Sequence, residues 1–357
     1  MPGRPQILPI CSPDKDLPAT GAVAASIAAA NAEAIARACA HLAAGELVAI
    51  PTETVYGLAA DAENGDAVAL VFKAKGRPRF NPLICHADSL AMAERHGVFD
   101  ARARRLAREF WPGPLTLILP KKPGSPVHDL VSAGLATIGL RVPAGPVRDL
   151  IAAFGQVVAA PSANLSGRMS PTRAEHVALQ LGGDVALILD AGPAQIGVES
   201  TIVALDRRQA RLLRPGGLAS QAIEAVLGEK LQRVASGDKV EAPGMLASHY
   251  APQTPLRLNA SKVRPGEALL AFGPDLPEGA DTAILLRNLS PTGDLSQAAA
   301  NFFQALHELD AAGAETIAAM PIPDHGLGEA INDRLARAAG PSGRWPGGKS
   351  GTQTGKD

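Results

Sequence analysis

The sequence predicts an α/β protein with two domains. Segments with the pattern of short buried strands alternate with segments of helical periodicity along most of the chain, which favours a largely parallel or mixed sheet covered by helices. The length of 357 residues exceeds what one hydrophobic core usually serves, and 46% of the residues are hydrophobic, as in ordered proteins. A segment rich in Pro, Gly, Ser and charged residues, 236–255, marks the boundary between the two parts.

The first domain is predicted over 31–230, after a flexible extension of residues 1–30. Asn31 can cap a helix that extends to residue 44, and 46–50 is then predicted as a strand that leads into a loop. The further predicted strands are 82–86, 115–119, 137–142, 157–160, 185–189, 200–205 and 211–213, and a helix over 218–227 closes the domain. In open α/β sheets ligands bind beyond the carboxyl ends of strands, so the loops after these strands are the expected site.

The second part is predicted as a smaller, Rossmann-like α/β domain behind a linker. Residues 231–255 form the linker, and its Pro-Gly-rich ends around His249 and Tyr250 make it a candidate lid over the site. The small domain covers 256–340, and 341–357 are expected to be a disordered tail. Its predicted elements are strands at 268–272, 282–286 and 316–320 and helices at 294–312 and 329–338.

Composition excludes several classes of protein. A formal net charge of −1 argues against a protein held on nucleic acid by bulk charge, because that needs a basic face. The three cysteines, Cys11, Cys39 and Cys85, are odd in number and widely spaced, so neither a disulfide framework nor a zinc site is indicated. No run reaches membrane-spanning length, and residues 17–30 lack the basic start of a signal peptide. We therefore expect a cytoplasmic protein.

Two polar segments stand where regular elements give way to loops. Lys73, Lys75, Arg77 and Arg79 follow an apolar helical stretch, and such a concentration of cations suits phosphate or carboxylate. The segment 160–167 follows a short apolar strand and offers hydroxyl and amide groups that can orient a nucleotide. Taken singly, each has a structural explanation, because cations favour a helix C-terminus and Ser and Asn favour turns.

The order of these and other motifs resembles one family, the YrdC-like domain. The matching segments are PTETVYGL at 51–58, KGRP at 75–78, NPLICH at 81–86, WPGPLT at 111–116, RVP at 141–143, APSANLSG at 160–167, GVEST at 197–201 and LRPG at 213–216. Two later segments, HYAP at 249–252 and GLGEAINDRL at 326–335, resemble the longer, two-domain form, the threonylcarbamoyl-AMP synthases. Separate structural accidents would not reproduce one family's order of loops.

The resemblance implies a reaction in which L-threonine, bicarbonate and ATP give threonylcarbamoyl-adenylate and pyrophosphate. This is the first step toward N6-threonylcarbamoyladenosine at position 37 of tRNA, so a transferase complex that acts on tRNA is the implied partner. The chemistry joins a carboxylate to a triphosphate, so fixed cations are needed to stabilise charge and to position the reactants. No membrane and no stable binding of nucleic acid is implied.

The resemblance also assigns residues. Lys75 and Arg77 are the expected catalytic residues. The threonine and bicarbonate side is lined by Thr52, Tyr56, His86, Arg141 and Ser200. ATP is held by Lys75, Arg77, Thr137, Ala160, Ser162, Asn164, Arg214 and Tyr250. The chain has no GxxxxGK[ST] motif and no dense carboxylate cluster, so Mg²⁺ is expected to arrive with ATP, held by its phosphates rather than by the protein.

Two other classes of function remain open. A concave basic surface on a YrdC-like domain could accept an RNA backbone, although the near-neutral charge and the lack of aromatic-rich RNA-binding motifs speak against this. The carbamoyl-adenylate enzymes of hydrogenase maturation share the YrdC-like domain. Those enzymes carry Cys-rich fingers, which three scattered cysteines cannot form.

Overall fold

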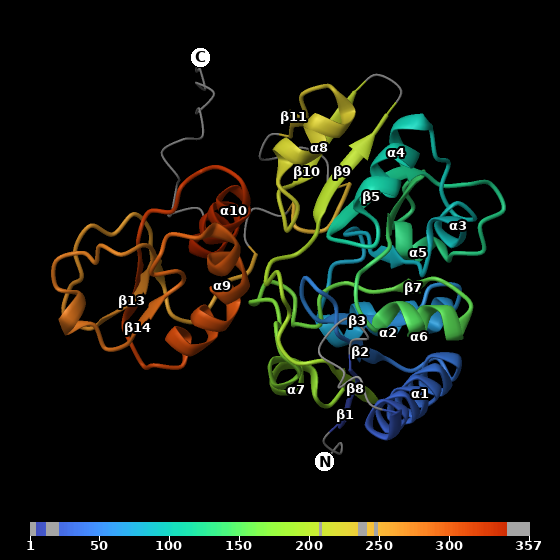
Figure 1. Ribbon diagram of the computed structural model, residues 1–357, viewed down its shortest axis with the longest axis horizontal. Helices are drawn as coiled ribbons and strands as arrows, with labels where there is room; N and C mark the ends of the chain where they lie inside the picture. The colour runs from blue at the N-terminus through green and yellow to red at the C-terminus, as the bar shows by residue number, and fades with distance from the viewer. Residues whose placement is uncertain (1–4, 12–20, 207–208, 235–240, 246–248, 341–357) are drawn as a thin grey trace, which may run out of the picture.

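The chain folds into two α/β parts that lie side by side, a larger one in blue to yellow and a smaller one in orange to red (Figure 1). The structure, a computed structural model, describes residues 5–11, 21–206, 209–234, 241–245 and 249–340, without the side chains of 21–27. Within these residues the strands form a mixed sheet of eleven strands and a second sheet of four. The predicted α/β class is therefore confirmed. None of the described helices is both long and apolar enough to cross a membrane.

The larger part carries the eleven-stranded sheet, in the order β1-β8-β2-β3-β7-β4-β6-β5-β9-β10-β11. Its strands are β1 (Gln6–Pro9), β2 (Val48–Ile50), β3 (Gly57–Asp61), β4 (Ile84–His86), β5 (Leu115–Pro120), β6 (Thr137–Arg141), β7 (Val158–Ala159), β8 (Leu187–Asp190), β9 (Thr201–Leu205), β10 (Ala210–Arg214) and β11 (Gln232–Arg233). Its helices are α1 (Gly21–Ala43), α2 (Gly65–Lys75), α3 (Leu90–Ala93), α4 (Ala101–Phe110), α5 (Asp129–Ser132), α6 (Val147–Phe154), α7 (Ala174–Leu181) and α8 (Ser220–Leu227).

The start of the chain differs from the prediction. Helix α1 begins at Gly21, well before Asn31, because the Ala-rich sequence favours helix through that position. Asn31 is not a cap: its side chain accepts a hydrogen bond from the Cys11 backbone N–H and donates one to the Cys11 carbonyl, both at 2.9 Å. Strand β1 pairs in parallel with β8 at the edge of the sheet, so residues 6–9 belong to the fold and are not a free extension.

Strand register brings the functional positions together at the ends of neighbouring strands in the middle of the larger sheet. His86 and Arg141 are paired neighbours at the carboxyl ends of the parallel strands β4 and β6. Strand β5 runs antiparallel to β6 and parallel to β9, which places Ser200, just before β9, near the end of β6. Strand β10 is antiparallel to β9, so its last residue, Arg214, returns to the same place.

The smaller part has the parallel sheet β12-β15-β13-β14, with two helices packed together beside it (Figure 1). The elements are β12 (Leu256–Arg257), β13 (Glu267–Ala271), the 3₁₀ turn η1 (Ala280–Thr282), β14 (Leu286–Asn288), α9 (Leu295–Asp310), β15 (Thr316–Ala319) and α10 (Leu327–Ala339). The strand predicted at 282–286 is displaced, because η1 occupies the start of that segment. The predicted tail, 341–357, lies outside the described residues.

The two parts are in intimate contact next to the strand ends. Gly197 adopts φ +77°, and a Cβ built there would lie 2.3 Å from the Ala299 carbonyl oxygen of α9. A side chain at 197 would therefore push α9 away, so glycine is required for this backbone approach. The small domain thus packs directly against the loop that precedes Ser200.

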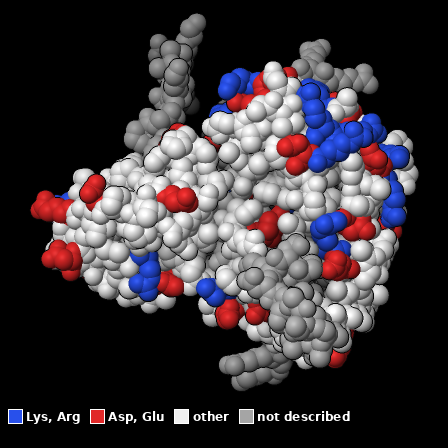
Figure 2. Space-filling view, viewed as in Figure 1, with Lys and Arg blue, Asp and Glu red and all other residues white. Residues whose placement is uncertain are grey.

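On the face seen in Figure 2, the described basic residues do not form a continuous patch. Figure 2 shows Lys and Arg gathered at the upper right, with Asp and Glu interleaved among them. In that part of the molecule α4 exposes Arg104, Arg105 and Arg108, and Arg104 pairs with Glu94 at 2.7 Å. This arrangement is typical of a solvated helix face rather than of a nucleic-acid groove.

Candidate active site

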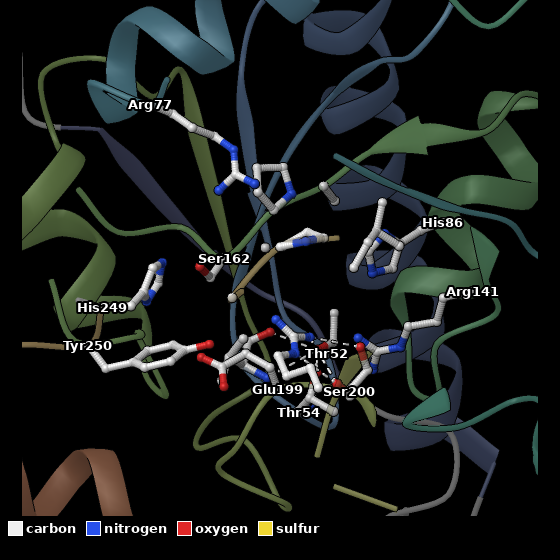
Figure 3. A pocket seen from close by; sticks show the side chains of 18 residues that line it. Thr52, Thr54, Arg77, His86, Arg141, Ser162, Glu199, Ser200, His249 and Tyr250 are labelled. Carbon is white, nitrogen blue, oxygen red and sulfur yellow. Dashed lines mark hydrogen bonds between the residues drawn. The ribbon is translucent and has the colours of Figure 1, made fainter. Parts of the chain in front are cut away.

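A closed pocket lies at the strand ends, between the larger part and the linker (Figure 3). Its lining residues are Thr52, Thr54, Val55, Gly57, Arg77, Ile84, His86, Arg141, Ala160, Pro161, Ser162, Glu199, Ser200, Arg214, Pro243, Gly244, His249 and Tyr250. The pocket's volume is only about 40 Å³, little more than the share of one water in the liquid, about 30 Å³. The linker therefore closes the site in this conformation.

Helix α2 supplies two buried cations. It ends at Gly76 in the left-handed conformation, which turns Arg77 toward the pocket, where Nε donates to the Asn81 carbonyl and Nη2 to the Pro82 carbonyl. Lys75 Nζ donates to the backbone carbonyls of Ser162 and Asn164, so it ties α2 to the loop after β7. The two triplets singled out in the sequence are thus in direct contact.

Burial makes these cations receptive to an anion. Desolvation, followed by repulsion from Arg77, holds the pKa of Lys75 well below its usual value. Desolvation and the nearby Arg214 lower the pKa of Arg77 to about 10. A phosphate or carboxylate beside Arg77 would offset the repulsion among these cations, so the arrangement favours an anionic ligand.

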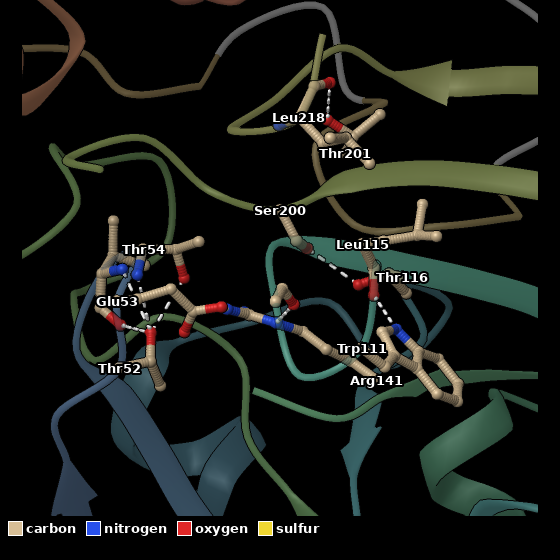
Figure 4. Close-up of polar contacts among 12 residues, drawn as sticks. Thr52, Glu53, Thr54, Trp111, Leu115, Thr116, Arg141, Ser200, Thr201 and Leu218 are labelled. Atoms are coloured by element: carbon tan, nitrogen blue, oxygen red, sulfur yellow. Dashed lines mark hydrogen bonds and ion pairs between the residues drawn. The ribbon is translucent and has the colours of Figure 1, made fainter. Parts of the chain in front are cut away.

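The loop after β2 faces Arg141 (Figure 4). Thr52 Oγ1 accepts hydrogen bonds from the backbone N–H groups of Thr54 and Val55 and donates to the Val55 carbonyl at 2.7 Å, which fixes the turn. The turn carries Glu53, whose Oε1 lies 2.7 Å from Arg141 Nη2 in a buried ion pair. Arg141 Nε donates to the Gly113 carbonyl, so the guanidinium is held from both sides.

His86, next to Arg141 in the sheet, is buried and uncharged. Desolvation and the positive charge of Arg141 lower the pKa of His86 to about 3. Its Nδ1 has no hydrogen-bond partner among the described residues. A neutral imidazole with a vacant nitrogen can position a polar ligand without adding charge.

The other side of the pocket is built around Ser200. Its carbonyl accepts hydrogen bonds from Arg214 Nε at 3.2 Å and Nη2 at 2.9 Å, and its hydroxyl lies 2.8 Å from Thr116 Oγ1. The preceding residue, Glu199, accepts from Ser170 Oγ and from Nε of Arg334 on α10, the latter at 2.9 Å. Burial disfavours the charged form of Glu199, but Arg334, Arg214 and the Ser170 hydrogen bond together lower its pKa.

The linker residues His249 and Tyr250 cover the pocket. Their rings meet edge-on with centroids 4.0 Å apart, and Tyr250 also lies 5.8 Å from the ring of Phe303 and 5.2 Å from the Arg334 guanidinium. Desolvation is the main cause that lowers the pKa of His249 to about 3, so it is neutral as well. Part of the linker, 235–240 and 246–248, lies outside the described residues.

Most residues expected from the sequence meet at this pocket, and four do not line it. Tyr56 is turned into the core, where its hydroxyl donates to Asp190 Oδ1 and to the Gly192 carbonyl, so it does not line the pocket in this conformation and its assignment to the threonine side stays a prediction. Thr137 begins β6 whereas Arg141 ends it, a separation of about 13 Å at 3.3 Å per residue, so Thr137 lies away from the pocket and the expected ATP contact stays a prediction.

Asn164 and Lys75 act behind the pocket lining in this conformation. The Asn164 amide donates to the carbonyls of Leu165 and Arg168 and shapes its own loop. Lys75 fixes the same loop through its hydrogen bond to the Ser162 carbonyl. Sequence reasoning missed Glu53, Glu199 and Arg334. Each lies in a motif segment, but their pairing partners are distant in the sequence.

Comparisons with known proteins agree with this geometry. A family model described as "Telomere recombination", covering the Sua5, YciO and YrdC proteins, matches residues 40–216, and one described as "Threonylcarbamoyl-AMP synthase, C-terminal domain" matches 218–340. The chain is 42% identical over 326 residues to the threonylcarbamoyl-AMP synthase of Bacillus subtilis (strain 168), covering 87% of this chain and 94% of that protein. It is 41% identical to the threonylcarbamoyl-AMP synthase of Pyrococcus abyssi, covering 83% and 91%.

A solved structure extends the likeness to three dimensions. The crystal structure of Pyrococcus abyssi Sua5 complexed with L-threonine has a TM-score of 0.80 and 35% identity, covering 93% of this chain and 97% of that chain. Both the larger and the smaller part are therefore shared with this structure. The chain belongs to the threonylcarbamoyl-AMP synthase family, in its two-domain form.

Proposed function

We propose that this chain makes threonylcarbamoyl-adenylate from L-threonine, bicarbonate and ATP, with release of pyrophosphate. The observation that carries the assignment is the closed pocket in which Arg77, Arg141 and Arg214 converge, within a chain similar over nearly its whole length to synthases of this name. The amine of threonine captures bicarbonate or CO₂ as an N-carboxylate, which attacks the α-phosphorus of ATP. Every reacting partner in the second step is an anion, and the pocket supplies buried cations.

We assign the nucleotide to the side of the pocket formed by Arg77, Ser162, Arg214 and Tyr250. Arg77 and Arg214 both line the pocket, so their guanidinium groups can hold phosphate oxygens and stabilise the charge that develops at phosphorus. Lys75 positions the loop that carries Ser162 through its two carbonyl contacts. Lys75→Ala and Arg77→Ala should each abolish turnover while leaving the circular dichroism spectrum unchanged. Wild-type rates in either variant would contradict this assignment.

We assign threonine to the side formed by Thr52, His86, Arg141 and Ser200. Arg141 presents a guanidinium fork suited to the amino acid's carboxylate. His86 is neutral and Ser200 offers a hydroxyl, so both can orient polar groups without competing for the charge.

Divalent metal is expected to enter with the nucleotide. The two carboxylates beside the pocket, Glu53 and Glu199, are each paired with an arginine, Arg141 and Arg334, so they do not form a metal cage. We propose that Mg²⁺ is held by the ATP phosphates, where it would neutralise part of their charge.

The linker acts as a lid in this proposal. Its His249 and Tyr250 cover the pocket, and a volume of about 40 Å³ cannot admit a nucleotide until they move. ATP with threonine should therefore change the rate at which trypsin cleaves the linker. Cleavage that is unaffected by the substrates would count against the lid.

We further propose that 31–230 is the catalytic domain, 231–255 the lid and 256–340 a docking domain that holds the lid. The product is a mixed anhydride, and such compounds hydrolyse readily, so direct transfer to a tRNA-modifying transferase in the cytoplasm is the proposed fate.

The test of the function is pyrophosphate release from ATP and Mg²⁺, with L-threonine and bicarbonate omitted one at a time and the adenylate identified by mass spectrometry. Dependence on both, with the mass of threonylcarbamoyl-AMP, is the expected result. Release without threonine would point to another carbamoylation or to a plain ATPase. No release would favour a binding protein.

A further inference from the structure

A second cavity lies behind the loop that carries Thr52 and Glu53. Its volume is about 510 Å³, more than ten times that of the closed pocket. It is bounded by residues 9–11, the turn at 144–146 and the segment 190–195 after β8. Thr52 lines both spaces, so one loop separates them.

The two spaces carry opposite charge. The closed pocket is lined by three arginines, Arg77, Arg141 and Arg214, against one carboxylate, Glu199, so its cations are in excess. Among the described residues that line the cavity, the acidic ones are Glu53 and Asp190, and none is Lys or Arg. The cavity therefore favours a positively charged group, whereas the pocket favours anions.

Glu53 has unused hydrogen-bonding capacity at this boundary. The residue is 9% exposed, and both of its carboxylate oxygens are buried without a hydrogen-bond partner among the described residues, although Oε1 lies 2.7 Å from Arg141 Nη2 in the ion pair. The other carboxylate of the cavity, Asp190, already accepts at Oδ1 from the Tyr56 hydroxyl and the Gly192 N–H, each at 2.8 Å. A buried carboxylate oxygen without a donor is costly, so a ligand donor at Oε2 would stabilise the site.

Threonine is the only proposed substrate with a positive charge. Its ammonium and carboxylate groups are attached to the same carbon, so a site that recognises both must place an anion and a cation side by side. Glu53 and Arg141, 2.7 Å apart and pointing toward one another in Figure 4, form such a pair. ATP and bicarbonate carry no cationic group of their own that could pair with the Glu53 carboxylate.

We propose that Glu53 binds the ammonium group of L-threonine while Arg141 holds its carboxylate, and that the amino acid reaches the pair through the acidic cavity. The inference rests on the proposed function, in which Arg141 takes the carboxylate. It adds a residue that selects an amino acid over a simple carboxylic acid. It also gives threonine a route that does not pass under the linker.

The test compares two ligands by calorimetry with the full chain, L-threonine and 3-hydroxybutyrate, which lacks only the amino group. Wild type should bind threonine at least tenfold more tightly than 3-hydroxybutyrate. Glu53→Gln should lose at least tenfold in threonine affinity and less than twofold for 3-hydroxybutyrate, so that the preference disappears. Equal weakening of the binding of both ligands, or an unchanged preference for threonine, would refute the proposed role of Glu53.

Controls separate this result from a general structural effect. Glu63→Gln changes a half-buried carboxylate outside both spaces and should keep the wild-type preference. If Glu53→Gln does not fold, Glu53→Asp is the alternative, because it keeps the charge on a shorter side chain. Glu53→Asp should weaken the binding of threonine but not that of 3-hydroxybutyrate, and wild-type affinity for threonine would contradict the proposal. If wild type itself binds no threonine, the proposed function is refuted. If wild type binds and turns over threonine while Glu53→Gln still prefers threonine to 3-hydroxybutyrate, only the role of Glu53 is refuted.

The access route has its own test. Gln195 is exposed at the cavity rim, and Gln195→Trp should raise KM for threonine severalfold with no change in KM for ATP. Gln221→Trp, at an exposed position of α8, is the matched control. An unchanged KM for threonine in Gln195→Trp would refute access through the cavity.

Discussion

One contact between the two domains is a buried arginine whose loss should loosen them. Arg334 of α10 is fully buried, and its Nε donates to Glu199 Oε2 at 2.9 Å. Its Nη1 donates to the Pro215 carbonyl at 2.5 Å, and its guanidinium lies over the Tyr250 ring. Arg334→Met keeps much of the side-chain volume but removes the charge, which leaves the Glu199 carboxylate buried without its main partner.

The expected cost follows from that geometry. Breaking a buried ion pair by removal of one partner destabilises a protein by about 3–5 kcal/mol, because the remaining charge is uncompensated. We expect a loss near the lower end, about 3 kcal/mol, because Ser170 and Arg214 still stabilise the Glu199 carboxylate. The measurement is urea unfolding followed by circular dichroism, together with KM for ATP, which should rise as Tyr250 loses its support.

Two further variants make the result decisive. Arg287→Met breaks the half-exposed pair with Glu308 elsewhere in the small domain and should cost less than about 1 kcal/mol. Adding Glu199→Gln to Arg334→Met should recover part of the lost stability, since the orphaned charge is then removed. If Arg334→Met were no less stable than Arg287→Met, the proposed importance of the interdomain ion pair would be refuted.

Three further predictions concern the site. Arg77→Lys keeps the charge but loses the forked contacts to the Asn81 and Pro82 carbonyls, so kcat/KM should fall by about 100-fold, or about 2.7 kcal/mol, in steady-state assays of pyrophosphate release. Gly244→Ala would place a Cβ 2.7 Å from Arg214 Cδ at φ +83°, and KM for ATP should rise tenfold or more; an unchanged KM would show that the linker need not close. The folded pKa of His249 is about 3 and its ordinary value is 6.5, so the unfolded chain binds more protons between these values and stability should fall as pH drops from 6.5. His249→Asn should flatten that dependence by up to about 1.4 kcal/mol per pH unit in urea midpoints, and an identical slope would contradict a neutral buried His249.

The sequence predicts several strands that are dominated by branched apolar residues, and it misses β3, which is not. The strands at 115–119 and 200–205 are found within a residue or two because Leu, Ile and Val dominate them. Strand β3, Gly57–Asp61, has the sequence GLAAD, whose small residues have little strand propensity, so only its position between β2 and β7 makes it a strand. Local pattern cannot report such tertiary support.

The site shows the same division. Arg77, Arg141 and Arg214 could be chosen from motifs because each stands at or just beyond the end of an element. All three line one pocket. Tyr56 belongs to the same motif as Thr52, but its side chain enters the core and bonds Asp190, 134 residues away. The pairing of Glu199 with Arg334 spans 135 residues and crosses the two domains, so no spacing in the sequence predicts it.

The backbone of Tyr250 links the small domain to catalysis. A non-glycine residue at φ +65° is in the left-handed region, which costs about 1–2 kcal/mol. Burial of a tyrosine ring removes about 150–250 Å² from water and contributes about 4–6 kcal/mol at 25 cal/mol per Å². This gain is offset by about 1–3 kcal/mol, because the Tyr250 hydroxyl is buried without a hydrogen-bond partner among the described residues. Tyr250 is 1% exposed, and much of the surface that buries it belongs to Phe303 and Arg334 of the small domain. With the small domain docked, burial exceeds strain and the lid closes; without it, the strain would remain and most of the gain would be lost. The margin of a few kcal/mol is also small enough for the binding energy of ATP to reopen the lid, so the second domain sets the balance between a closed site and one that admits its nucleotide.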